Sequence, residues 1–159
     1  MFKEFNLENL ENSKELLENI LDENRKKIAD LLEIENKTYK NFVLPFQEIG
    51  ESTNDFLTPI FHIDSVKNSE ITTKVYEECI PVISKYETEI SQNESIYISL
   101  KDIQSKEQST LNNIQNKVLE NEIRDFKLSG CHLENNKKKR LEEISLRLSE
   151  LSHKFSQNL

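Results

Sequence analysis

Glycine and proline are scarce in this 159-residue chain, with 2 and 3 residues, and tryptophan is absent. Strands need frequent tight turns, which draw mainly on glycine and proline, so this scarcity argues against an all-β sandwich or barrel. Long helices with short connections are expected instead. Hydrophobic residues make up 35% and charged residues 31% of the chain, as suits helices that each bury one stripe.

Cysteines and long apolar runs are also few. Cys79 and Cys131 are far apart and form no CxxC pair, so reduced thiols are the simple interpretation. No run approaches the roughly 18 apolar residues of a membrane span, and the N-terminus has no apolar signal region. We therefore expect a soluble, cytoplasmic protein with no membrane partner.

Basic residues are outnumbered, 21 against 29 acidic ones, and the net charge is -8. Nucleic acid is a poor partner for such a chain, because affinity for phosphates comes mainly from Lys and Arg. The one dense basic run, residues 137–140, is followed at once by Glu142 and Glu143. We interpret this run as a solvated helix start rather than a phosphate site.

Apolar residues recur at helical spacing along most of the chain. The pattern predicts an antiparallel helical bundle of about six helices, with Thr38 as one helix cap, Asn68 or Ser69 as another, and Gly130 closing a helix. We expect the second helical segment to loosen at Gly50 and at residues 52–54. Three prolines lie inside helical patterns, and we expect some of them to kink the bundle's helices. The pattern predicts a kink or a helix restart at Pro45, a kink or the first turn of a new helix at Pro59, and a bend at Pro81.

The last predicted helix has a heptad-like apolar pattern with steps of 3, 4, 3 and 4. Such a seam is typical of antiparallel bundle packing. The pattern is still running where the sequence stops at Leu159, from which we expect a cut within a longer protein. The seam residues are Leu141, Ile144, Leu148, Leu151 and Phe155.

None of the three histidines lies in a HExxH motif, in which two histidines one helical turn apart bind zinc. His132 adjoins Cys131, but sequence neighbours rarely ligate one metal together, so we interpret both as loop residues. His62 and Asp64 point to different helix faces and suit a capping or surface role. His153 lies beside the seam and is expected to be exposed.

Other catalytic patterns are missing. Paired acids such as Glu77 and Glu78 are expected on solvated faces, the two isolated glycines cannot form a phosphate loop, and no GxSxG elbow occurs. We therefore predict no catalytic, cofactor-binding or metal-binding residue. The four tyrosines lie on or beside helical stripes and are expected to pack in the core with their hydroxyls at the rim: Tyr39, Tyr76, Tyr86 and Tyr97.

Several stretches nevertheless resemble one family in order. Residues 117–130 read KVLENEIRDFKLSG, and residues 147–158 read RLSELSHKFSQN. Earlier stretches are NFVLPFQE at 41–48, IFHIDSVKNS at 60–69, and CIPVISKYETE at 79–89 followed by QNE. Together they resemble the thimet oligopeptidase and oligopeptidase A family of zinc metallopeptidases across roughly residues 38–159, while residues 1–37 fit more loosely.

The resemblance implies a mostly helical enzyme that cleaves short peptides in a deep channel between two lobes. In that family the zinc is held by a HExxH motif and a downstream Glu in the C-terminal half, and the N-terminal helices form one channel wall. The chain lacks the catalytic half, so no catalytic or metal residue carries over. We expect residues 1–159 to be the N-terminal domain of a zinc metalloendopeptidase, inactive by itself.

An alternative is a stand-alone helical interaction or scaffold protein, since the seam is present and no site is. The first interpretation, an N-terminal lobe of an oligopeptidase, makes a further prediction. A lobe that normally packs on a missing half of the enzyme should expose more apolar surface than an independently folded domain. Self-association through that surface is therefore expected.

Overall fold

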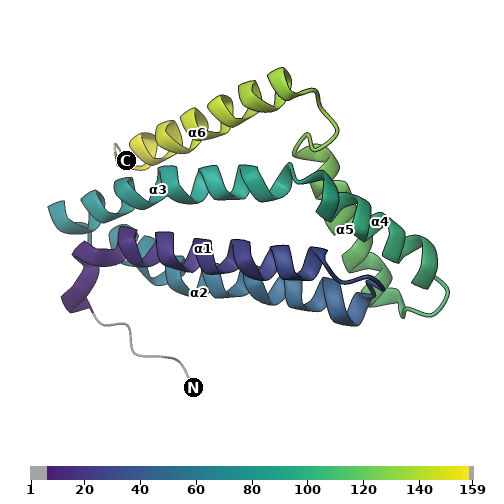
Figure 1. Ribbon diagram of the computed structural model, residues 1–159. Helices are drawn as coiled ribbons and strands as arrows, with labels where there is room; N and C mark the ends of the chain where they lie inside the picture. The colour runs from purple at the N-terminus through teal and green to yellow at the C-terminus, as the bar shows by residue number, and fades with distance from the viewer. Residues whose placement is uncertain (1–6, 158–159) are drawn as a thin grey trace.

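The structure, a computed structural model, describes residues 7–157 and is all-α (Figure 1). Within this range there is no strand, and the prediction of a six-helix fold is confirmed. Two short helical turns precede longer helices: η1 (Leu7–Asn12), a 3-10 helix, and η2 (Tyr39–Val43), a π-helix. The α-helices are α1 (Ser13–Leu32), α2 (Leu44–Val66), α3 (Glu70–Ser91), α4 (Glu94–Glu107), α5 (Asn113–Leu128) and α6 (Asn135–Gln157).

Reciprocal hydrogen bonds begin several of these helices. The Thr38 hydroxyl accepts from the backbone N–H of Asn41 at 3.1 Å, and Asn41 Oδ1 accepts from the Thr38 N–H at 2.7 Å. The Thr38 cap is therefore confirmed. Of the two candidates for α3, Asn68 and Ser69, the cap is Ser69, whose side chain takes part in the same reciprocal arrangement. Such caps satisfy backbone donors that have no partner inside the helix. Gly130 has φ +80, the left-handed conformation expected where the helix closes.

α2 runs unbroken from Leu44 to Val66, so the predicted loosening at Gly50 and at residues 52–54 is wrong. The reason is a continuous buried stripe on this helix, in which Thr53 replaces an apolar residue. Asn24 of α1, itself buried, donates from Nδ2 to the Thr53 hydroxyl at 2.8 Å. The buried stripe of α2 therefore tolerates a polar residue at this position, because the Thr53 hydroxyl has a buried hydrogen-bond partner.

The prolines lie at different places in the helices. Pro45 is in the first turn of α2, where no backbone donor is lost to the helix ladder. Pro59 lies inside α2 and Pro81 inside α3. Kinks at all three positions stay predictions.

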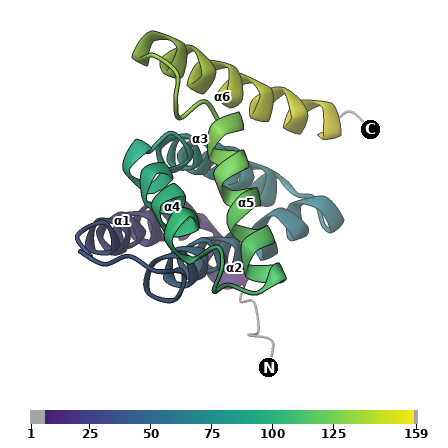
Figure 2. The same cartoon turned by 90° about the vertical axis from the view of Figure 1, so that its right-hand side faces the viewer.

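The helices form a bundle with one helix on its outside. α1, α2 and α3 lie side by side, and α4 and α5 pack at one end of them (Figure 1). Seen from that end, α6 lies over α3, on the side away from α1 and α2 (Figure 2). The main contact of α6 is with α3.

Two clusters of buried apolar side chains form the core. One joins α1, α2 and α3, and includes Leu17, Leu57 and Cys79. The other lies where α4 and α5 meet η2 and the ends of α1 and α2, and includes Phe42, Leu100 and Leu119. No described residue of α6 belongs to either cluster. The core is therefore formed by the helices that precede α6.

Within residues 7–157, no helix combines the length and the apolar character that a membrane crossing requires.

Candidate interaction surface

Polar contacts join α6 to the rest of the bundle at two places. Ser84 of α3 donates to the Ser149 hydroxyl of α6 at 3.3 Å. Near the start of α6, Lys138 Nζ lies 2.6 Å from Glu94 Oε1, and only 15% of the Lys138 side chain is exposed. The hydrogen bond from Lys138 lowers the pKa of Glu94. Small hydroxyls and one ion pair bury little apolar area, so they hold the helix less firmly than an apolar seam would.

His153 supplies the most buried contact of α6. Its ring stacks on Tyr76 of α3 with centroids 4.1 Å apart, and Tyr76 in turn packs on Phe61 of α2 at 4.6 Å. Only 7% of His153 is exposed, so the prediction of an exposed His153 is wrong. Four of the five seam residues, all except the partly buried Leu141, face outward, and this orientation places the neighbouring His153 against α3.

The electrostatic surroundings of His153 and Tyr76 are acidic. His153 Nε2 has no hydrogen-bond partner among the described residues and lies 4.0 Å from Glu77 Oε1. Burial, helped by the nearby Asp64 carboxylate, raises the pKa of the Tyr76 phenol. Tyr76 is therefore un-ionised near neutral pH and acts here as a packing surface.

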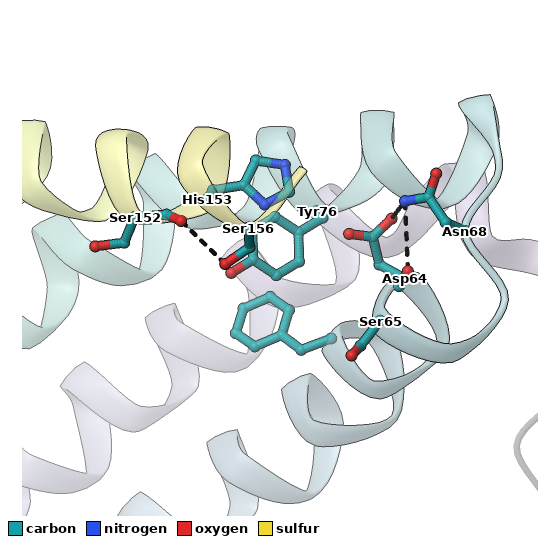
Figure 3. Close-up of a pocket in the computed structure, with 8 residues that line it drawn as sticks. Asp64, Ser65, Asn68, Tyr76, Ser152, His153 and Ser156 are labelled. Carbon is teal, nitrogen blue, oxygen red and sulfur yellow. Dashed lines mark hydrogen bonds between the residues drawn. The ribbon is translucent and has the colours of Figure 1, made fainter. Parts of the chain in front are cut away.

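A pocket of about 540 Å³ opens beside this stack, where α2, α3 and α6 meet (Figure 3). The buried Asp64 carboxylate on its wall accepts hydrogen bonds from Asn68 Nδ2 and from the Thr73 hydroxyl, both at 3.0 Å. These bonds join the end of α2 to the start of α3. We interpret the pocket walls as a structural junction between helices.

The opposite face of α6 carries a row of exposed apolar side chains, here called the α6 row: Ile144, Leu148, Leu151 and Phe155. Their exposed fractions are 48%, 63%, 46% and 65%. The sequence correctly predicts that these residues share a face. The expected packing of that face inside the bundle is wrong for this chain, because α6 faces α3 with Ser145, Ser149 and His153 instead.

The remaining candidate residues are not brought together into one site. Cys131 is fully buried and free, whereas the neighbouring His132 is exposed. His62 is also exposed, on the outside of α2. Among the described residues, no three His, Cys, Asp or Glu side chains are grouped to hold a metal ion.

Residues of the basic run at the start of α6 form ion pairs with acidic neighbours. Lys137 lies 3.7 Å from Glu134, and Arg140 lies 2.8 Å from Glu143. These exposed pairs agree with the interpretation of a solvated helix start. Lys138 differs, because its partial burial against Glu94 gives it a structural role that the charge pattern does not reveal.

Some structural residues have no clear sequence signal. Half-buried Glu122 of α5 accepts a hydrogen bond from Gln47 of α2 at 3.3 Å, and burial raises its pKa. Tyr39 and Tyr86 are buried, and Tyr76 and Tyr97 are partly buried, close to the expectation for the tyrosines.

These features define an all-α domain with a row of exposed apolar side chains on its last helix. The chain belongs to the neurolysin/thimet oligopeptidase family: the profile of that family's N-terminal domain matches residues 17–138.

Curated relatives carry the oligopeptidase A name. The oligopeptidase A of Haemophilus influenzae is 36% identical over 146 residues, which cover 90% of this chain and 21% of that protein. The oligopeptidase A of Escherichia coli is 37% identical over 123 residues, which cover 77% of this chain and 18% of that protein. A probable cytosolic oligopeptidase A of Arabidopsis thaliana is 28% identical over 123 residues, which again cover 77% of this chain and 18% of that protein. The chain spans about a fifth of the length of these relatives.

Proposed function

We propose that this chain is the non-catalytic, channel-wall domain of a zinc-dependent oligopeptidase that hydrolyses short peptides. The observation that carries the proposal is the family match over residues 17–138, together with relatives named oligopeptidase A. The domain would shape access to the channel, and the reaction would take place on a different part of the enzyme. In a cytoplasmic setting its substrates would be short peptides released by other proteases.

The chain's own residues do not fit a peptidase zinc site. The sequence has no HExxH motif, and the described residues group no three metal-binding side chains. Zinc, when bound to the whole enzyme, would polarise the scissile carbonyl and activate water. We propose that its ligands lie outside residues 1–159 and that this chain alone hydrolyses no peptide.

Two measurements test this proposal. The first incubates the purified chain with zinc and fluorogenic peptides, with Escherichia coli oligopeptidase A as the positive control. We expect no hydrolysis above the buffer rate. The second replaces the matching segment of that enzyme with this chain. Peptidase activity in the chimera is expected, and an inactive but folded chimera would count against the proposal.

The second candidate function is a stand-alone interaction protein, which the exposed α6 row favours. It predicts that the chain alone forms a defined complex. Sedimentation velocity over a wide concentration range distinguishes the two functions. A stand-alone interaction protein should form a complex of fixed stoichiometry at low micromolar concentration, whereas a channel-wall domain without its enzyme should self-associate through the α6 row only weakly and at higher concentration.

A further inference from the structure

We propose that the α6 row is the docking surface for an apolar helix with an acidic flank, supplied by the catalytic part of the oligopeptidase. This inference rests on the proposed function and adds a specific surface and a specific partner chemistry to it. Three independent features of α6 support it: its exposed apolar row, its separation from the core, and its charge.

The geometry of the α6 row suits a helix. Ile144, Leu148, Leu151 and Phe155 follow one another at steps of 4, 3 and 4, so they form one straight ridge. The ridge extends over about 16 Å of helix axis, at about 1.5 Å per residue. Side chains with this spacing insert between those of a facing helix. Four large apolar side chains on one ridge also exceed what scattered surface residues explain.

The position of α6 leaves the ridge free for a partner. α6 contributes no described residue to either core cluster, and it contacts α3 through Ser149 and His153 on its other face. The α6 row therefore contributes no side chain to the core clusters of the described residues. Substitution of α6 row residues in the isolated domain should therefore lower its stability only slightly.

Charge indicates what the partner carries. α6 has six Lys or Arg and three Glu, a net charge of +3, whereas the whole chain has -8, so the other residues sum to -11. Three of the basic residues, Arg140, Arg147 and Lys154, recur every seven positions beside the α6 row. Serines lie on its other side, at 145 and 152. A partner helix with Asp or Glu along one flank complements this arrangement.

A second copy of the chain fits this surface less well. In an antiparallel pair of α6 helices, the basic flanks would face each other and repel. In a parallel pair, the basic flank would face serines and find no acidic partner. Arg140 and Arg147 now pair with Glu143 and Glu150 at 2.8 and 3.0 Å, but such exposed pairs are weak and readily exchanged.

The occupant is available in the relatives. The chain spans about a fifth of their length, so the remaining four-fifths of such an enzyme can provide a covering helix. This makes the enzyme's own catalytic part a simpler occupant than an unrelated protein.

The test compares the same substitutions in the isolated chain and in the chimera with the Escherichia coli enzyme. The test variant carries Leu148→Ser and Leu151→Ser. The matched control carries Val66→Ser and Ile114→Ser, whose side chains are 65% and 76% exposed. We expect both variants to leave the thermal midpoint of the isolated chain unchanged. In the chimera, the test variant should lower the midpoint by several degrees and reduce peptidase activity, while the control should not.

A second pair of variants tests the acidic flank. Arg147→Glu with Lys154→Glu should lower the midpoint of the chimera more than that of the isolated chain, in which only the Arg147–Glu150 pair is lost. The extra loss in the chimera should shrink at high salt because screening weakens exposed charge interactions. Lys26→Glu with Lys27→Glu on α1 is the control and should have no such effect.

The outcomes separate the two proposals. A wild-type chimera that is folded but inactive overturns the proposed function and this inference with it. An active chimera that tolerates the α6 row variant overturns only the inference. Two results with the isolated chain also overturn the inference. One is that the Leu148→Ser, Leu151→Ser variant unfolds. The other is that the wild-type chain forms a stable dimer and this variant is monomeric.

Discussion

His153 of α6 lies over Tyr76 of α3, with ring centroids 4.1 Å apart and ring planes inclined by 22° (Figure 3). This stack contains the most buried described residue of α6, and a hydrogen bond between Ser84 and Ser149 joins the same two helices. The His153–Tyr76 pair therefore contributes directly to the attachment of α6.

The first prediction concerns that attachment. His153→Ala removes the stacked ring, which is worth about 1 kcal/mol beyond its buried area. Because α6 shares no core cluster with the other helices, the loss should appear as local opening of α6. Amide hydrogen exchange along α6 should accelerate about fivefold, while α1 and α2 keep their rates. His132→Ala, at an exposed position, should change neither. Equal acceleration in all helices would show that α6 unfolds only with the whole domain.

Adjacent leucines on α1 provide the second prediction. Leu17 is fully buried in the α1–α2–α3 cluster, whereas 47% of Leu16 is exposed. Leu17→Ala should therefore lower the free energy of unfolding by about 2–5 kcal/mol through lost burial and a cavity. Leu16→Ala should cost less than about 1 kcal/mol. Urea denaturation monitored by circular dichroism measures both, and similar losses would contradict the assigned face of α1.

Much of the fold could be predicted from the sequence because its signals are local. Helical periodicity, the Thr38 and Ser69 caps and the left-handed Gly130 each depend on a few neighbouring residues. The continuity of α2 could not be predicted in this way. It depends on the buried bond between Asn24 and Thr53, which are 29 positions apart. The sequence of α2 alone therefore gives a weaker helical signal at residues 50–54 than the continuous helix in the structure would suggest.

The surface of α6 shows the same limit. The steps of 3 and 4 identify which residues share a face, and that part is confirmed by the exposed α6 row. Periodicity does not say which neighbour covers a face, because this depends on where the helix docks. The burial of His153 follows from the docking on α3 and has no signal in its own neighbourhood.

The two glycines should respond to alanine in opposite ways. At Gly130 the backbone has φ +80, and a Cβ would lie 2.7 Å from Leu133 Cδ1 and 2.9 Å from Leu141 Cδ2. Gly130→Ala should therefore destabilise the chain by at least about 1 kcal/mol. Gly50 lies inside α2 with open space around it, so Gly50→Ala should stabilise by about 0.5–1 kcal/mol. Thermal unfolding of the two variants should move in opposite directions.

Thiol reactivity gives a test of the core. Cys79 is fully buried, and burial raises its pKa to about 11. Cys131 is also fully buried, and burial raises its pKa as well. The thiolate is the reactive form, so both cysteines should resist an aromatic disulfide reagent in the native protein at neutral pH. Both should react rapidly in denaturant. Fast labelling of one thiol in the native state would show that its helix opens.

The last prediction concerns pH and Glu122. Burial raises the pKa of this carboxyl above its usual 4.5, although the hydrogen bond from Gln47 opposes the shift. With the folded-state pKa above the unfolded one, the neutral form favours folding. That contribution is fully present below the unfolded pKa and is lost as pH rises through the folded pKa. Glu122→Gln stays neutral at every pH and should be more stable than the wild type at about pH 7.

The stability difference between the Glu122→Gln variant and the wild type should shrink as pH falls toward about 4, because the wild-type side chain is then protonated too. Urea midpoints of both proteins across this range measure the difference. Glu51→Gln, at an exposed position on α2, is the control and should show no such dependence. A difference for Glu122→Gln that stays constant with pH would mean that the amide acts through its hydrogen bonding to Gln47 rather than through removal of a buried charge.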